Sequence, residues 1–223
     1  MNFVPFDPNE RVEITQGQLP HWQQRGRTYF ITWRTADSIP VELWRQWQAE
    51  REAWLHHHQV TLATLDTLTS DQRREYHEHF SHRWQDHLDD CHGECLLRRE
   101  DLRAHVEAAL RHFDGKRYDL GDFVLMPNHV HVLVTLHDGE DVLKTCFSWK
   151  RFSAGVIQSL LGRHGEFWQP ESFDHIIRSE ASLRRVQLYI EENPAKARLQ
   201  SAEYTWHRPE SWRIFSKNPA PQF

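Results

Sequence analysis

The sequence predicts an α+β fold built on one antiparallel sheet with helices on one face. Three observations support this class. The run RTYFITWRT at 27–35 is rich in aromatic and β-branched residues, which is typical of a strand. Two apolar runs at 117–126 and 129–136 flank Pro127-Asn128 and predict a β-hairpin. Amphipathic segments lie before and after this hairpin, and such segments form helices that cover a sheet.

The first strand is followed by a long polar region, which we predict to be a helical insert of residues 40–95. Within it, Thr69 and Gln72 have the spacing of a capping box at the start of a helix. Four apolar residues then recur at every fourth position, as on one face of a helix: Tyr76, Phe80, Trp84 and Leu88. The insert would interrupt a domain that spans residues 20–200.

Two helices flank the predicted hairpin. The first lies near 100–113 and ends at Asp114-Gly115. The second begins at Asp141 and stops at Gly162. The first is amphipathic through Leu102, Val106, Ala109 and Phe113, so it would place this apolar side against the sheet.

The C-terminal third is predicted to hold a short strand within 167–178 and a last helix near 182–193. Pro194 is expected to break or bend the chain before a further helical piece. Residues 201–223 are assigned to a C-terminal tail, loosely ordered from residue 204 onward. The complete order of elements matches a ferredoxin-like plan with the helical insert after its first strand.

The composition narrows the classes of function. No apolar run approaches the roughly 20 residues that a membrane span needs, and the start MNFVPFDPNERVEI lacks the regions of a signal peptide. The three cysteines are too few and unpaired for a disulfide scaffold, which favours a reducing, cytoplasmic location. The sequence has no Gly-rich phosphate loop, so it does not indicate nucleotide hydrolysis.

Charge is unevenly distributed along the chain. The formal net charge is −5, of which residues 1–115 carry −6 and residues 116–223 carry +1. Bulk electrostatics therefore do not indicate nucleic-acid binding. Any such binding must depend on a local site in the second half.

Two histidines stand in the otherwise apolar run FVLMPNHVHVLVT at 123–135. Residues two apart in a strand point the same way, so His129 and His131 share a face with Leu133 and Thr135 while the intervening valines face the core. The two imidazoles would lie close enough to bind one metal ion. The same spacing suits two half-exposed histidines on a solvent-facing strand, so the motif alone leaves both interpretations open.

A second pair of candidate residues lies on the last helix, SLRRVQLYIEENPAKA. Leu183, Val186 and Ile190 form its apolar stripe. Tyr189 and Asn193 are four positions apart and therefore neighbours on one flank of that stripe. A phenol and an amide would project together from the edge of the buried face, although ordinary packing and helix termination before a proline explain the pattern equally well.

Taken together, LMPNHVHVLV and the later YIEENPAKARL resemble the single-tyrosine HUH transposases, and most closely the REP-associated tyrosine transposases. The first strand, SWKRFSA at 148–154 and FDHIIRSE at 173–180 are similar to other segments of that family. The resemblance covers residues 27–38 and 96–200 and implies a ferredoxin-like fold. The long acidic insert and the lack of a pronounced positive charge depart from the family pattern.

The resemblance also implies a site and a chemistry. His129 and His131 would bind a divalent metal, Mg²⁺ or Mn²⁺, with Asn193 as third ligand, and Tyr189 would be the nucleophile. The protein, a monomer or a homodimer, would cleave and rejoin single-stranded, hairpin-containing DNA through a 5′-phosphotyrosine. Five basic residues are candidates for DNA contacts, with a solvated helix face as the alternative explanation: Lys150, Arg151, Arg178, Arg184 and Arg185.

Two further interpretations stay open. One is a domesticated DNA-binding protein that recognises hairpin DNA without cutting it. The other is a metal-binding structural protein centred on the insert, although the spacing of Cys91 and Cys95 is not a standard zinc motif. The insert contains the following histidines: His56, His57, His58, His77, His79, His82, His87 and His92.

Overall fold

The computed structural model describes residues 3–16, 20–76, 79–80 and 92–212. Its centre is a five-stranded sheet with the strand order β6-β3-β5-β4-β7, in which every neighbouring pair is antiparallel. The strands are β3 (Thr28–Arg34), β4 (Tyr118–Leu125), β5 (His129–Leu136), β6 (Phe173–Ile176) and β7 (Thr205–His207). The predicted α+β class, the antiparallel sheet and the hairpin are confirmed.

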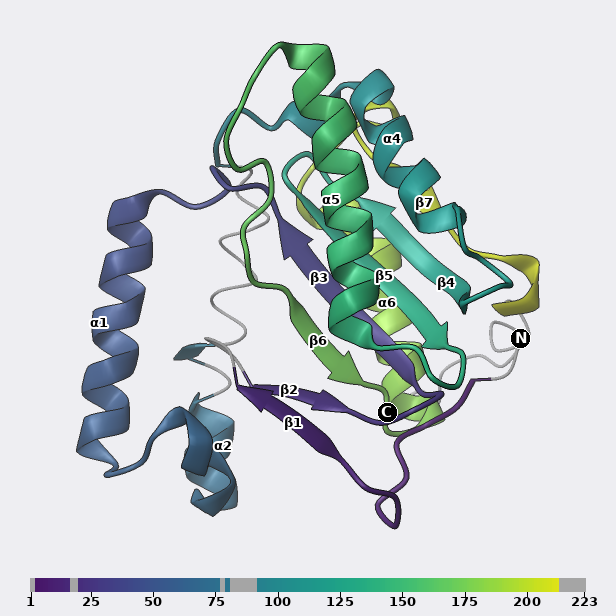
Figure 1. The fold of residues 1–223 in the computed structure, drawn as a ribbon. Coiled ribbons are helices and arrows are strands. Elements are labelled where there is room, and N and C mark those ends of the chain that lie inside the picture. Colours follow the sequence, from purple (N-terminus) through teal and green to yellow (C-terminus); the bar gives the residue numbers. More distant parts are fainter. Residues whose placement is uncertain (1–2, 17–19, 77–78, 81–91, 213–223) are drawn as a thin grey trace.

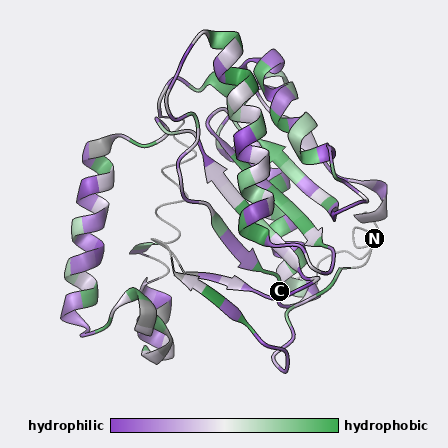
Figure 2. Ribbon diagram, viewed as in Figure 1, coloured by the Kyte–Doolittle hydropathy of each residue, from purple (hydrophilic) through white to green (hydrophobic). Residues whose placement is uncertain are grey.

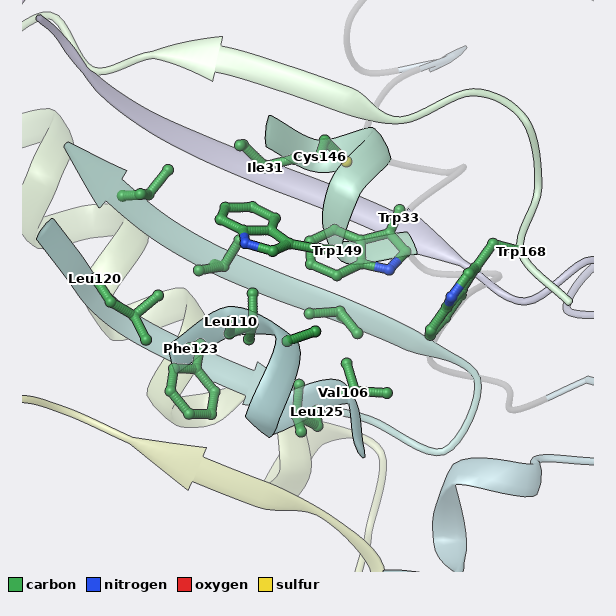
Figure 3. Close-up of a cluster of buried hydrophobic side chains, with 14 of the residues drawn as sticks. Ile31, Trp33, Val106, Leu110, Leu120, Phe123, Leu125, Cys146, Trp149 and Trp168 are labelled. Carbon is green, nitrogen blue, oxygen red and sulfur yellow. The ribbon is translucent and has the colours of Figure 1, made fainter. Parts of the chain in front are cut away.

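Two helices cover one face of the sheet, as Figure 1 shows: α4 (Glu100–Arg111) and α5 (Val142–Leu161). The side chain of Asp141 accepts a hydrogen bond from the backbone N–H of Lys144 and so caps α5 at the predicted residue. Between the helices and the sheet lies the larger core, with Trp33 stacked on Trp149 at 5.8 Å between ring centroids and Trp168 edge-on to Trp33 (Figure 3). This core contains no part of the candidate site.

A third helix, α6 (Glu180–Lys196), packs on the opposite face of the sheet. It buries Leu183 and Ile190 against Phe30, Val124 and Leu133 in a second, smaller core. The expectation of helices on one face is therefore corrected. The physical reason is that β3, β4 and β5 carry apolar side chains on both faces, and each face must be covered to remove them from water.

The helix α6 continues through Pro194, so the predicted break at this residue is wrong. Proline removes one backbone donor but its φ suits a helix, and here it stands in the last turn. The carbonyl groups of Asn193 and Pro194 still accept bonds from the N–H groups of Ala197 and Leu199. The helix therefore holds Asn193 fully inside its hydrogen-bonded length.

Two strand regions were not foreseen in the sequence. A separate hairpin is formed by β1 (Glu13–Gln16) and β2 (Pro20–Gln23). In the segment assigned to the C-terminal tail, a 3-10 turn at Ser201–Glu203 leads into β7. This strand, in the part predicted to be loosely ordered, pairs with β4 at the edge of the sheet, and Trp212 is buried beyond it. A three-residue strand is too short to show a periodic pattern.

The insert is a small helical unit with its own aromatic cluster. It contains α1 (Val41–His57), a 3-10 segment (Leu62–Thr67) and α2 (Ser70–Tyr76). The predicted capping box is confirmed, since the N–H groups of Thr69 and Gln72 donate to each other's side chains. Tyr76 and Phe80 of the predicted stripe are buried together, while Trp84 and Leu88 lie outside the described residues.

The two ends of the insert meet beside the tip of the central hairpin. The carboxylate of Asp37 accepts a 2.7 Å hydrogen bond from the N–H of Glu94, and a Cβ at Gly93 would lie 2.6 Å from the Asp37 carbonyl oxygen. Gly93 also has φ of +89°, which other residues rarely adopt. A 3-10 turn at Leu96–Arg98 then leads the chain back to α4. The insert is thus tied to the domain at this neck.

Hydropathy separates the insert from the sheet. Figure 2 shows α1 as largely hydrophilic and β4 and β5 as largely hydrophobic, in agreement with the full burial of β5. None of the helices in the described part of the chain combines the length and the hydrophobicity that a membrane span requires.

Candidate active site

The candidate site lies on the face of the sheet that α6 covers. His129 and His131 of β5 are both fully buried there, and their register partners on β3 are Arg34 and Thr32. The valines that alternate with this face, Val130, Val132 and Val134, enter the larger core, as predicted. The imidazoles are not half-exposed, because α6 packs on the histidine face of the sheet, for which no covering helix was predicted from the sequence.

Hydrogen bonds fix the orientation of the His129 ring. The side-chain N–H of Asn128 donates to the carbonyl of His92 at 3.0 Å, which turns its amide oxygen towards Nδ1 of His129 at 2.8 Å. An amide oxygen accepts and does not donate, so Nδ1 of His129 carries the proton. The lone pair of His129 is therefore on Nε2.

His131 is held from the neighbouring strand. Its Nδ1 lies 2.7 Å from the hydroxyl oxygen of Thr32, and its ring stacks on Phe30 with 5.5 Å between centroids. The two imidazole centroids are 4.7 Å apart. A hydroxyl beside Nδ1 is the kind of outer partner that orients a ligating histidine.

The helix α6 brings Tyr189 and Asn193 to the same place. The Tyr189 hydroxyl lies 3.4 Å from Nε2 of His131, and the phenol ring stands edge-on to Phe30 with 6.0 Å between centroids. Asn193 is one turn further along α6 and is fully buried. The structure thus brings together all four residues that the sequence singled out for catalysis and metal binding.

Burial keeps both imidazoles neutral. Loss of solvation lowers the pKa of His129 to about 3, while the neighbouring Asn193 amide raises it and the positive charge of Arg34 lowers it. Burial, followed by the charge on His129, holds the pKa of His131 well below its usual range. A neutral imidazole has the free lone pair that a metal ion requires.

Several polar atoms of the site are buried without a hydrogen bond among the described residues. They are Nε2 of His129 and both side-chain atoms of Asn193, Oδ1 and Nδ2: the Asn193 amide is near enough to His129 to raise its pKa, but none of these atoms makes a hydrogen bond of ordinary geometry. A buried polar atom left without a partner costs roughly 1–3 kcal/mol, and such atoms point to a bound group. Two imidazole nitrogens and one amide oxygen are a donor set that fits a divalent metal.

Five residues were predicted to contact DNA, and for Lys150 the structure corrects this prediction. Its side chain is buried, and its ammonium donates to the carbonyl of Pro170 at 2.7 Å, where burial lowers its pKa. Arg151 is exposed on α5, on the opposite side of the sheet from Tyr189. Arg184 and Arg185 are exposed on α6, on the same side of the sheet as the tyrosine. Arg178 is exposed just before α6, and its guanidinium carbon lies 5.5 Å from the centroid of the Phe6 ring, which packs against the larger core on the other side.

Sequence reasoning missed Arg34, a half-buried cation beside the histidines. The signal was available in part, since Arg34 alternates in phase with Thr32 and Phe30 along β3. What the sequence could not give is the register that pairs this residue with His129.

The histidines of the insert form no comparable site in the part of the chain that is described. His58 stacks on Trp54 with 3.8 Å between centroids, and Cys95 is buried. Among described residues no group of three or more histidine, cysteine or acidic side chains is arranged to hold a metal. His77, His82, His87 and Cys91 lie outside the described residues.

Residues 96–193 match the family model of IS200-like transposases. No curated protein matches the sequence. Similar solved structures include a REP-associated tyrosine transposase bound to a REP hairpin, with 17% identity, a TM-score of 0.43 and coverage of 79% of this chain and 71% of that chain. A Deinococcus radiodurans R1 protein named as a transposase has 16% identity, a TM-score of 0.34 and coverage of 77% and 96%. Both scores are below 0.5, so the family match alone bears on what this chain is.

Proposed function

Through residues 96–193 the chain belongs to the family of IS200-like transposases, and on that premise we propose that it is a metal-dependent single-tyrosine transposase. It would cleave and rejoin single-stranded DNA through a 5′-phosphotyrosine intermediate. The observation that carries the proposal is the Tyr189 hydroxyl 3.4 Å from Nε2 of His131, next to His129 and Asn193. A hairpin in the substrate is proposed from the resemblance of the two sequence motifs to REP-associated tyrosine transposases.

The covalent step exchanges one phosphodiester for another. The oxygen of Tyr189 attacks phosphorus and forms the new O–P bond, while the bond from phosphorus to the 3′ oxygen breaks. The phenol proton passes to solvent, and the departing oxygen takes up a proton to become a free 3′-OH. Because the phosphotyrosine remains a diester, another 3′-OH can reverse the reaction without ATP, in agreement with the missing phosphate loop.

A divalent cation, when bound, would withdraw charge from the phosphate and help to orient it. His129 and His131 would hold it through Nε2, and Asn193 through Oδ1. The mixed nitrogen and oxygen donors suit Mn²⁺ or Mg²⁺. The unsatisfied buried atoms of His129 and Asn193 support this assignment.

Other residues of the chain prepare the site. Thr32 and Asn128 orient the imidazoles, and burial keeps these rings neutral. The ammonium of Lys196 lies 5.5 Å from the centroid of the Tyr189 ring. A phenol with an ordinary pKa of about 10 is a weak nucleophile at neutral pH.

The test is a covalent-adduct assay with hairpin DNA that has single-stranded flanks, in the presence of Mn²⁺. With the label at the 3′ end of the strand, we expect a species that survives denaturant and migrates with the protein. With the label at the 5′ end, the labelled fragment should run free with a 3′-OH. Tyr189→Phe should bind the DNA and form no adduct, whereas Tyr204→Phe, a control outside the site, should behave as the unaltered protein does.

A domesticated hairpin-binding protein is the second candidate, favoured by the acidic balance of the whole chain. It would bind the same DNA with no adduct in either Mn²⁺ or Mg²⁺. An adduct that persists in Tyr189→Phe would instead show that another residue is the nucleophile.

A further inference from the structure

Arg34 is the cation that β3 presents next to the histidine pair. It is the register partner of His129 and lies on the same face as Thr32, the partner of His131. It is half-buried, and burial lowers its pKa to about 10, so at neutral pH it remains charged. A charged guanidinium has a planar fork of donors that matches a phosphate.

The insert places an aromatic ring against this cation. The guanidinium carbon of Arg34 lies 5.6 Å from the centroid of the Trp44 ring, in the first turn of α1. Trp44 is half-buried and stacks on Trp47 with 5.3 Å between centroids and 18° between planes. The tryptophan is therefore supported from within the insert and directed towards Arg34.

The neck of the insert fixes this arrangement beside the site. The carboxylate of Asp37 accepts from the N–H of Glu94, and two residues earlier the carbonyl of His92 accepts from the side-chain N–H of Asn128. The amide oxygen of Asn128 in turn orients the ring of His129. One chain of contacts thus joins the insert to the histidine pair. The insert is positioned to touch whatever occupies that site.

We propose that Arg34 and Trp44 form a grip for the DNA strand beside Tyr189, in which the guanidinium binds a backbone phosphate and the indole stacks on a neighbouring unpaired base. The inference rests on the proposed function and assigns a substrate-binding role to the insert. In the free protein the guanidinium lies over the indole. When DNA is bound, Arg34 turns to the phosphate and the base takes its place on the ring.

The grip combines the two forces that hold single strands. A phosphate contact from arginine makes the affinity for DNA depend on salt concentration. Each base stacked on an aromatic ring adds to the affinity whatever the base sequence of the DNA. The acidic insert is otherwise a poor surface for DNA. Trp44 needs no charge of its own to bind a base, which reconciles the composition of the insert with a role in binding.

The experiment measures equilibrium binding in the Tyr189→Phe background, which keeps the DNA intact. The probe is the hairpin oligonucleotide of the adduct assay, with an abasic site moved through each position of its single-stranded flanks. We expect one position to weaken binding by about 5- to 150-fold, the range for one stacked base. Adding Trp44→Leu should weaken binding to intact DNA. In that variant, the abasic site at the sensitive position should cause no further loss of affinity. Trp44→Phe should keep most of the sensitivity to this abasic site.

Arg34→Gln tests the other half of the grip. It should lower the slope of log affinity against log salt by about 0.7, the value for one phosphate contact on a single strand. The matched control is Arg117→Gln, another arginine over an aromatic ring (Phe113, 4.9 Å) at the far end of the β4–β5 pair. Trp54→Leu, further along α1, controls for damage to the aromatic cluster of the insert.

The outcomes separate the inference from the proposed function. If the unaltered protein forms the adduct but Trp44→Leu keeps full sensitivity to every abasic site, the grip is wrong and the proposed function stands. If no adduct forms but the abasic sensitivity depends on Trp44, the grip stands and the cleavage chemistry is wrong. If the protein does not bind the probe at all, both are wrong.

Discussion

The hydroxyl of Tyr189 lies 3.4 Å from Nε2 of His131, a residue 58 positions earlier in the chain. This contact exists because α6 is held on the histidine face of the sheet by Leu183 and Ile190. A second attachment is polar, since Gln187 of α6 and Arg208 both donate to the buried carboxylate of Asp122. The site therefore depends on how one helix docks, and the predictions below separate docking, metal binding and DNA binding.

Thr32→Val should raise the metal concentration that cleavage requires. The substitution keeps the shape of the side chain and removes the oxygen that lies 2.7 Å from Nδ1 of His131. Loss of such an orienting partner typically costs about 10- to 100-fold in metal affinity or activity. The measurement is a Mn²⁺ titration of the rate of adduct formation.

The control for this prediction is Thr28→Val on the same face of β3. The Thr28 hydroxyl bonds Thr135 and accepts from the N–H of Val4, away from the histidines. It should lower stability without moving the Mn²⁺ titration. An unchanged titration in Thr32→Val would contradict the orienting role.

Divalent metal should stabilise the folded protein. A ligand at 100 times its dissociation constant adds about 2.7 kcal/mol to the free energy of unfolding. Thermal unfolding with Mn²⁺ should therefore occur at a higher temperature than with chelator, and His129→Ala should remove the difference. Replacing His56, His57 and His58 of the insert should leave it intact; if that variant loses the shift instead, the metal binds in the insert.

Much of the site was predictable because its spacings are local. The two-residue period of a strand aligns His129 with His131, and one helical turn aligns Tyr189 with Asn193. Both rules need only the element type, which the hydrophobic patterns of β5 and α6 gave. That the two pairs would meet was indicated by the family resemblance and not by either pattern.

The parts that were missed depend on distant segments. Arg34 belongs to the site through its register with β5, and α6 chooses its side because Phe30, Val124 and Leu133 leave a second apolar face to cover. Lys150 was misassigned for a related reason. In the sequence, a lysine on an amphipathic helix has the pattern of a surface cation. The segment that covers Lys150, at Pro170, is 20 residues away and is known only from the structure.

Lys150 and Arg185 should respond in opposite ways to the same loss of charge. Lys150→Gln breaks the 2.7 Å bond to the Pro170 carbonyl and should lower the free energy of unfolding by about 1–3 kcal/mol, with little effect on DNA. Arg185→Gln on the exposed side of α6 should leave stability unchanged and reduce the salt slope of binding by about 0.7. Denaturant unfolding and binding at several salt concentrations measure both, and a reduced salt slope in Lys150→Gln would reinstate that lysine as a DNA contact.

Asp122 should make the protein less stable as pH rises from about 4 to 6. An irregularity in β4 between Leu120 and Phe123 turns Asp122 to the α6 side, where burial raises its pKa to about 6 despite the bond from Arg208. The folded state then binds more protons than the unfolded state between an ordinary pKa near 3.9 and the raised value, so stability is greatest below this window and falls through it. A shift of about 2 pH units corresponds to about 3 kcal/mol at most. The measurement is the free energy of unfolding by denaturant from pH 4 to 8, for the unaltered protein and for Asp122→Asn, which cannot ionise. The free energy of the unaltered protein minus that of the variant should fall as pH rises. If this difference rises instead, Arg208 outweighs burial and the ion pair stabilises the docking of α6.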